Sequence, residues 1–292
     1  MTESHGTGAP ERRPAPGVFQ IGLRTSTLPP FDRTWTTVVH AHGRGVVIDP
    51  GFEDPGDATT VADRLRAHGV RDVASVLVTH AHPDHVAGLP ALLEAVGPVP
   101  VRAHPLEAER VPAPVTPLLD GRTLNVAGRT VRALATPGHA AGHLSFVVDG
   151  TGVVAGDLVT GSGASWVGVP HGDPDAYLDS LERVRALAPA WLAPAHGDLP
   201  ADPATLLDAA RAHRLARARD VLAALERATT LSELAVRIYG RDFAPDGPAT
   251  EHAHRLVRAS LAAHLLRGMR ALEVAHLGDD EEGPYVRTAP RS

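Results

Sequence analysis

The sequence predicts an α/β (α+β) fold in which two β-sheets carry outer helices, followed by a small helical domain. Over the first two thirds of the chain, short β-type runs alternate with helical segments, through both hairpin-like and crossover connections. After residue 203 the pattern becomes almost entirely helical. We therefore expect a disordered tail over residues 1–17, a mixed domain over 18–203, a helical domain over 204–277 and a mobile tail over 278–292.

The first half of the mixed domain alternates strands with helices. Strands are expected over residues 18–23, 36–41, 46–48 and 70–78, and helices over 57–68 and 89–96. The helix over 57–68 places Val61, Ala62 and Leu65 on one face, and Gly69 provides its C-terminal stop. A histidine-rich segment lies just before the second helix, on a strand-to-helix loop.

The rest of the chain passes from strands to helices. Strands are expected over residues 122–126, 130–135, 144–148, 152–155 and 191–193, with one helix over 175–188. Helices over 204–228, 231–239 and 250–267 then precede a β-like run over 271–275. A Thr-x-x-Glu box at Thr230 and Glu233 predicts the N-cap of the middle helix. Three helices followed by β-like chain are the outline of a winged helix.

Composition excludes several kinds of site and partner. The chain has no cysteine, so any metal site must use nitrogen and oxygen ligands. The net charge of -6 argues against a nucleic-acid footprint over the whole chain. No apolar stretch approaches the ~18 residues of a membrane span, and the polar N-terminus has no signal-peptide pattern. We therefore expect a cytoplasmic protein with no membrane partner.

The segment Thr-His-Ala-His-Pro-Asp-His at residues 79–85 carries the clearest chemical signal. It places four metal-competent side chains within six residues, namely His80, His82, Asp84 and His85. Two histidines at i and i+2 in extended chain point to the same face, and a turn at Pro83 can bring Asp84 and His85 beside them. Imidazole suits zinc and other divalent first-row metals. The segment therefore predicts a metal site.

Four further polar residues follow strands or turns elsewhere in the mixed domain. They are Asp49, His139, Asp157 and His196. Each alone is compatible with an ordinary turn residue. Loops at one end of a sheet converge in space, so together with the histidine segment these residues predict one shared site.

These segments resemble those of the metallo-β-lactamase-fold hydrolases over roughly residues 18–198. The motifs, in chain order, are VVIDPG with Asp49, THAHPDHVAG with His80 to His85, TPGHAAGH with His139 and His143, AGD with Asp157, and PAHG with His196. The resemblance implies a four-layer αββα sandwich with a dinuclear metal site. By it, His80, His82 and His139 hold one metal, Asp84, His85 and His196 hold the other, and Asp157 bridges both.

The resemblance also implies a reaction. Two zinc ions are expected, although iron or manganese fits the same donors. A hydroxide that bridges the two metals would attack an ester, thioester or lactone-type carbonyl of a small molecule, with Asp84 and Asp157 as the catalytic carboxylates. Asp49 and His143 are expected to hold loops and orient ligands. The expected pocket residues are Trp166, His171 and Tyr177, of which Tyr177 also fits the buried stripe of the helix over 175–188.

The helical domain leaves the substrate open. It resembles the winged-helix tail of the β-lactamase-like protein 2 branch, which implies an endoribonuclease of single-stranded RNA as the alternative function. Arg211, Arg214, Arg217 and Arg219 recur at near-helical spacing, which is compatible with RNA but more typical of a solvated helix face. A lid or a homodimer contact is an equally good role for the domain.

Two other function classes fit less well. A metal-sensing winged-helix regulator predicts a missing metal ligand and a strongly basic recognition helix, and the sequence has neither. A flavodiiron-type oxidoreductase requires a flavin domain, and the C-terminal part has no βαβ pattern.

Overall fold

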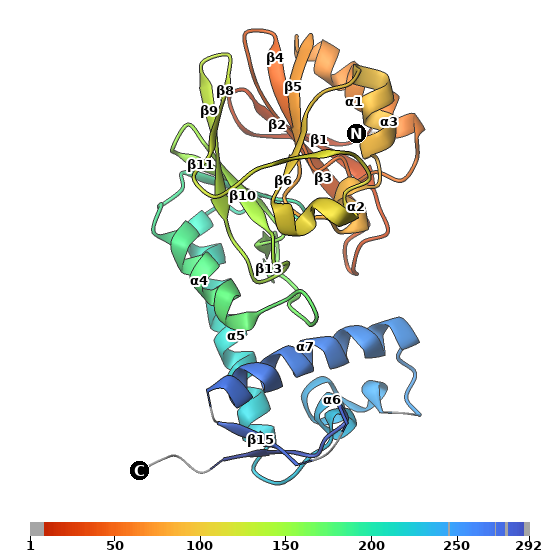
Figure 1. The fold of residues 1–292 in the computed structure, drawn as a ribbon, viewed down its shortest axis with the longest axis vertical. Coiled ribbons are helices and arrows are strands. Elements are labelled where there is room, and N and C mark those ends of the chain that lie inside the picture. The colour runs from red at the N-terminus through yellow and green to blue at the C-terminus, as the bar shows by residue number, and fades with distance from the viewer. Residues whose placement is uncertain (1–8, 245, 272, 278–279, 289–292) are drawn as a thin grey trace, which may run out of the picture.

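The computed structural model describes residues 9–244, 246–271, 273–277 and 280–288 (Figure 1). Its first sheet has seven strands in the order of the chain. They are β1 (Glu11–Ala15), β2 (Val18–Arg24), β3 (Arg33–Ala41), β4 (Arg44–Ile48), β5 (Asp72–Leu77), β6 (Val101–Ala103) and β7 (Val115–Pro117). Pairing is antiparallel from β1 to β4 and parallel from β4 to β7.

Helices cover the outer face of this sheet. The helices α1 (Gly56–Ala67) and α3 (Leu89–Val96) connect parallel strands, and between β5 and α3 lies the short α2 (Pro83–Val86). Val61 and Leu65 of α1 and Leu89 and Leu92 of α3 share one apolar core with side chains of the sheet. Crossover helices that return the chain to a parallel strand bury their apolar stripe in this way.

The second sheet has five strands in the order β14-β11-β10-β9-β8. They are β8 (Thr123–Val126), β9 (Arg129–Ala135), β10 (Leu144–Val148), β11 (Gly152–Gly156) and β14 (Trp191–Pro194). One face packs on the first sheet through a core that includes Leu77 and Phe146. The other packs on α4 (Pro174–Arg185) and α5 (Pro203–Ala224). The four-layer αββα sandwich is thus confirmed.

The C-terminal unit combines the far part of α5 with α6 (Leu231–Tyr239), α7 (Glu251–Arg270) and a small sheet of β15 (Val274–His276) and β16 (Tyr285–Arg287). It has its own apolar core, which includes Leu234, Leu261 and Tyr285. The capping box at the start of α6 is present with both hydrogen bonds. The winged-helix assignment of this unit stays a prediction. None of the helices in the described ranges has the length and apolar character needed to cross a membrane.

The prediction of a tail over residues 1–17 is wrong for its second half, where β1 pairs with β2. The Arg12 side chain holds this strand in place. Its guanidinium carbon lies 3.9 Å from the centroid of the Trp35 ring, and its N–H groups donate to the carbonyl oxygens of Pro194 and Gly197. Residues 1–8 lie outside the described residues.

The predicted mobile tail over residues 278–292 is likewise wrong in part, because β16 pairs with β15 and buries Tyr285. An aromatic side chain at the edge of a small core is enough to fix a short strand there. Residues 278–279 and 289–292 lie outside the described residues.

Candidate metal centre

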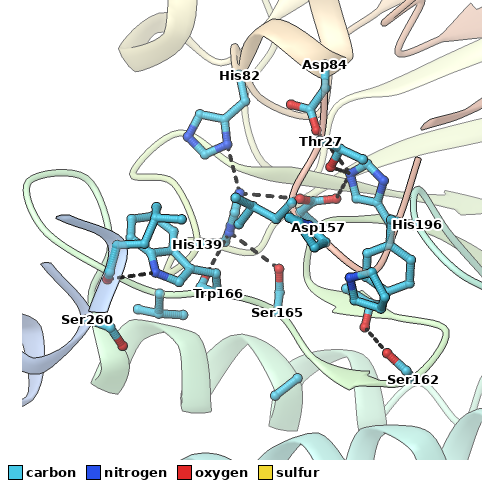
Figure 2. A pocket seen from close by; sticks show the side chains of 18 of the residues that line it. Thr27, His82, Asp84, His139, Asp157, Ser162, Ser165, Trp166, His196 and Ser260 are labelled. Atoms are coloured by element: carbon cyan, nitrogen blue, oxygen red, sulfur yellow. Dashed lines mark hydrogen bonds and ion pairs between the residues drawn. The ribbon is translucent and has the colours of Figure 1, made fainter. Parts of the chain in front are cut away.

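The chain-distant histidines and aspartates meet at one edge of the sandwich, where several strands end. His80 and His82 follow β5, Asp84 and His85 lie on α2, and His139 lies in the turn between β9 and β10. Asp157 follows β11 and His196 follows β14. Figure 2 shows His82, Asp84, His139, Asp157 and His196 pointing toward a common centre. The structure thus brings together all seven of the ligands predicted from the sequence.

Three imidazoles form the first ligand group. His82 Nδ1 lies 2.9 Å from His80 Nε2 and 3.0 Å from His139 Nε2, and the Nε2 atoms of His80 and His139 are 3.2 Å apart. Two nitrogens that bind one zinc ion tetrahedrally at about 2.0–2.1 Å lie roughly 3.3 Å apart. The triangle therefore has the size of one face of a tetrahedral site.

The second ligand group combines Asp84, His85 and His196. His196 Nε2 lies 3.3 Å from Asp84 Oδ2. Asp157 lies between the two groups and uses a different oxygen toward each. Its Oδ1 is 3.4 Å from the Nε2 atoms of both His85 and His196, and its Oδ2 is 3.5 Å from His139 Nε2.

The outward nitrogens of His85, His139 and His196 have hydrogen-bond partners. His139 Nδ1 donates to the Trp166 carbonyl oxygen at 2.7 Å, and His196 Nδ1 donates to the Arg33 carbonyl oxygen at 2.9 Å. Asp49 Oδ2 lies 2.9 Å from His85 Nδ1 and also accepts a hydrogen bond from the Thr79 hydroxyl. These contacts fix which nitrogen carries the proton and leave Nε2 as a lone pair that faces the centre.

The donor set fits divalent cations. Among the buried side-chain atoms of the described residues, His85 Nε2 and Asp157 Oδ1 have no hydrogen-bond partner. An unpaired buried lone pair is costly, and a bound cation would satisfy both atoms at once. Several neutral imidazoles have lone pairs that face one another at about 3 Å, and a bound cation would satisfy these as well.

The pKa shifts of the candidate ligands also suit a bound cation. Burial opposes ionisation of Asp157 and Asp84, but facing histidines outweigh it, holding the pKa of Asp157 well below its usual range and lowering the pKa of Asp84 to about 2. Burial lowers the pKa of His82 to about 3. Burial would also lower the pKa of His85, but the carboxylates of Asp157 and Asp49 outweigh it and raise that pKa. A proton on His85 therefore competes with a metal ion for the same nitrogen.

Asp49 and His143 lie behind the ligands, as the resemblance implies. Asp49 accepts hydrogen bonds from both the backbone and the hydroxyl of Thr79, the residue before the first ligand. His143 Nε2 accepts from the backbone N–H of Asp157 at 3.0 Å. Gly51, in the same motif as Asp49, packs so tightly that a Cβ there would lie 1.6 Å from the Asp84 carbonyl oxygen.

Glu107 is a supporting residue that the sequence reasoning missed. It lies on the short 3-10 helix Pro105–Arg110 and is fully buried. One carboxylate oxygen accepts from the backbone N–H of Ala81, between the ligands His80 and His82, at 2.9 Å. The other accepts from Gly142 N–H, in the turn that carries His139, also at 2.9 Å. Glu107 therefore ties together the two loops of the first ligand group.

A cavity of about 590 Å³ opens onto the metal centre. Its walls are the ligands, the loop over residues 26–31, the segment over 160–167 and side chains of α5, α6 and α7. Trp166 lines it as predicted. His171 is exposed and is not among the lining residues, while Tyr177 is fully buried and donates its hydroxyl to the Leu158 carbonyl oxygen. The ordinary core role of Tyr177 thus prevails.

The C-terminal unit reaches the metal centre through the segment that carries Trp166. Arg214 of α5 donates to the Ser165 carbonyl oxygen at 2.6 Å, and Trp166 Nε1 donates to the Leu256 carbonyl oxygen of α7 at 3.2 Å. The same segment holds His139, through the Trp166 carbonyl oxygen and the Ser165 hydroxyl 3.4 Å away. No sequence motif marks these contacts, because they depend on how α5 and α7 pack.

Comparison with known proteins places the chain in a family. The sequence model of the metallo-β-lactamase superfamily matches residues 29–196. An atrochrysone carboxyl ACP thioesterase from Passalora fulva is 30% identical over 223 residues, which cover 72% of this chain and 64% of that protein. A hydroxyacylglutathione hydrolase from Vibrio parahaemolyticus is 30% identical over 165 residues, which cover 56% of this chain and 62% of that protein. The match therefore spans less than two thirds of each of these relatives.

A solved structure extends the likeness to the C-terminal unit. A metallo-β-lactamase family protein from Thermus thermophilus superposes with a TM-score of 0.77 at 25% identity. The superposition covers 94% of this chain and 99% of that one. The helical unit is therefore part of an architecture that this chain shares with another protein of the family.

Proposed function

The chain belongs to the metallo-β-lactamase superfamily of hydrolases, and we propose that it uses two metal ions to hydrolyse an ester, thioester or lactone bond of a small molecule. One observation carries the dinuclear part of this proposal. The two oxygens of Asp157 face different ligand groups, Oδ1 toward His85 and His196 and Oδ2 toward His139. A carboxylate so placed suits a bridge between two cations.

The two groups of ligands would each hold one ion, and histidine-rich ligation favours zinc over iron or manganese. Bound there, the ions would lower the pKa of water toward neutrality and polarise the carbonyl group under attack. Asp84 is the terminal carboxylate of the site and faces the cavity beside His196. With its pKa lowered to about 2, it is ionised at neutral pH and can accept a hydrogen bond from the attacking water.

The reaction balances with water as the second substrate. The water oxygen bonds to the carbonyl carbon, and the carbon–sulfur or carbon–oxygen bond to the leaving group breaks. The departing thiolate or alkoxide takes up the proton lost by the water, giving a carboxylic acid and a thiol or alcohol. Backbone and side-chain contacts from Trp166, Arg33 and Asp49 keep the ligand histidines oriented throughout.

The size of the cavity and the names of the relatives support a small-molecule substrate. A volume of about 590 Å³ lies within the ~300–1,000 Å³ typical of small-ligand sites. One relative is named a thioesterase and another a hydrolase of hydroxyacylglutathione. Helices of the C-terminal unit close one side of the cavity, which favours a compact substrate over a single-stranded RNA.

The proposal is tested by metal analysis and hydrolysis assays on the same preparations. We expect about two transition-metal ions per chain and hydrolysis of simple acyl-thioesters without cleavage of single-stranded RNA. Asp157→Asn removes a charge from the bridging position and should lower both the metal content and kcat/KM, the latter by about a thousandfold or more.

The matched control is Asp149→Asn, which changes a partly exposed turn aspartate that pairs with Arg129. It should keep wild-type metal content and activity. Full activity in Asp157→Asn, or one ion per chain in the active wild type, would contradict the dinuclear proposal. Cleavage of RNA that Asp84→Ala abolishes would replace the small-molecule substrate with the RNA alternative.

A further inference from the structure

The end of the cavity formed by the C-terminal unit is positively charged. Arg214 and Arg217 of α5 line it, one turn apart on the same helix, together with His213 and with His252 of α7. The lining residues include two acids, Asp84 and Asp157, and both belong to the metal centre at the other end. The cavity thus joins a metal site to a cationic wall that lacks carboxylates of its own.

Neither cation of this wall has a carboxylate partner among the described residues. Arg214 is only 4% exposed, its Nε has no hydrogen-bond partner, and its guanidinium lies 5.1 Å from the Tyr177 ring centroid. Arg217 stacks over the Tyr239 ring at 4.5 Å. By contrast, Arg211, one turn earlier on α5, lies 3.9 Å from Glu182 and away from the cavity.

Placing two cations side by side without a counter-charge is unfavourable. The effect reaches neighbouring groups, since burial and then the positive charge of Arg214 lower the pKa of His264 to about 3. Folded proteins keep such unbalanced charge mainly at functional sites, where a ligand completes the set.

We propose that Arg214 and Arg217 form a receptor for an anionic group, a carboxylate or a phosphate, carried by the substrate away from the bond that is cut. This inference rests on the proposed hydrolase function and narrows its substrate to acidic esters and thioesters. Arginine is suited to this task because its planar donors match carboxylate and phosphate oxygens.

The receptor lies close enough to the metal centre for one short molecule to span both. Arg214 bonds to Ser165, and the hydroxyl of Ser165 lies 3.4 Å from the Nδ1 atom of the metal ligand His139. Binding energy gained at a remote charge of this kind can position the scissile bond.

A binding experiment tests the receptor without relying on turnover. Calorimetry on the metal-loaded protein compares glutarate, 4-phosphonobutanoate and pentanoate, which share a chain length and differ in the distal group. We expect glutarate or the phosphonate to bind about tenfold or more tightly than pentanoate. The stronger of the two identifies the distal group as carboxylate or phosphate.

Variants of α5 assign the preference to the receptor. Arg217→Gln should reduce the preference for the anionic probe over pentanoate to less than about threefold in affinity, and Arg217→Lys should restore part of that preference. Arg211→Gln removes the same charge outside the cavity and should leave the preference intact. Arg214→Gln also removes the bond to Ser165, so Arg217 is the decisive position.

The outcomes separate this inference from the proposed reaction. Equal affinity of all three probes in the wild type, or an equal loss in Arg211→Gln and Arg217→Gln, would overturn the receptor. A preference that Arg217→Gln abolishes, found in a protein that hydrolyses no thioester or ester, would support the receptor and overturn the proposed reaction. With thioesters that carry or lack a distal carboxylate, we expect Arg217→Gln to raise KM for the acidic member alone.

Discussion

The two ends of the cavity are built in opposite ways. At the metal end, carboxylates and imidazole lone pairs face one another, and the outward nitrogens of His85, His139 and His196 are held by the protein. At the helical end, Arg214 and Arg217 line the cavity, and no acid lies among the lining residues contributed by the C-terminal unit. One end presents lone pairs that suit cations, and the other presents cations that suit an anion.

This difference indicates which end of the cavity determines the reaction and which determines the substrate. The metal end is held by a rigid network within the sandwich, so its geometry is set before any substrate arrives. The helical end belongs to a unit with a core of its own, which meets the sandwich at Ser165 and Trp166 and through ion pairs between α7 and the start of α4. We therefore expect the reaction type to depend on the sandwich and the choice of substrate to depend on the helices.

The largest expected effect concerns the rigidity of the metal end. Glu107→Gln keeps the shape of the side chain but replaces one of two accepting oxygens with an amide group that donates. One of the two loops then loses its anchor, so we expect metal affinity to fall about 10–100-fold. Competition of the loaded protein with a chromogenic chelator measures this.

The control for this prediction lies two residues away on the same short helix. Glu109→Gln changes an exposed glutamate and should keep wild-type affinity. An unchanged affinity in Glu107→Gln would mean that the ligand loops hold their geometry without this anchor.

The same division explains what the sequence could predict. The ligands follow strands in short motifs such as Thr-His-Ala-His-Pro-Asp-His, and strand ends converge at one edge of a sheet. Their chemistry is therefore visible locally. Helices such as α1, α4 and α6 were also predictable, because an apolar stripe or a capping box marks them.

Other features depend on contacts that no local pattern encodes. The strand β1 is polar in sequence and is fastened by Arg12 over Trp35, an interaction between separate strands. Glu107 resembles an ordinary surface glutamate until the 3-10 helix carries it between two loops. The arginine stripe of α5 suggested a single solvated face, but Arg214 is buried in the cavity wall while Arg211 pairs outside it.

The next prediction concerns the positive field at the helical end. His264 of α7 is buried, and its Nε2 lies 3.5 Å from Arg214. Burial and the charge of Arg214 lower its folded-state pKa to about 3, whereas an unfolded histidine has a pKa of about 6.5. As the pH falls below about 6.5, the unfolded chain takes up a proton that the folded chain refuses, so the free energy of unfolding falls by about 2 kcal/mol by pH 5.

Urea unfolding at pH 7 and pH 5 checks this. His264→Gln should lose about 2 kcal/mol less than the wild type over this interval. His252→Gln, an exposed position on the same helix, is the matched control. The same pH dependence in wild type and His264→Gln would show that burial and the charge of Arg214 do not lower the pKa of His264.

The smallest expected effect tests whether the two ends are independent. Trp166 bonds to the helices through its side chain and to His139 through its backbone carbonyl oxygen. Trp166→Phe removes only the indole hydrogen bond and some contact area, so we expect the free energy of unfolding to fall by about 1 kcal/mol while the metal content stays at the wild-type value. Loss of metal in this variant would mean that the hydrogen bond from Trp166 to α7 also sets the position of His139. The helical unit would then control the metal centre as well as the choice of substrate.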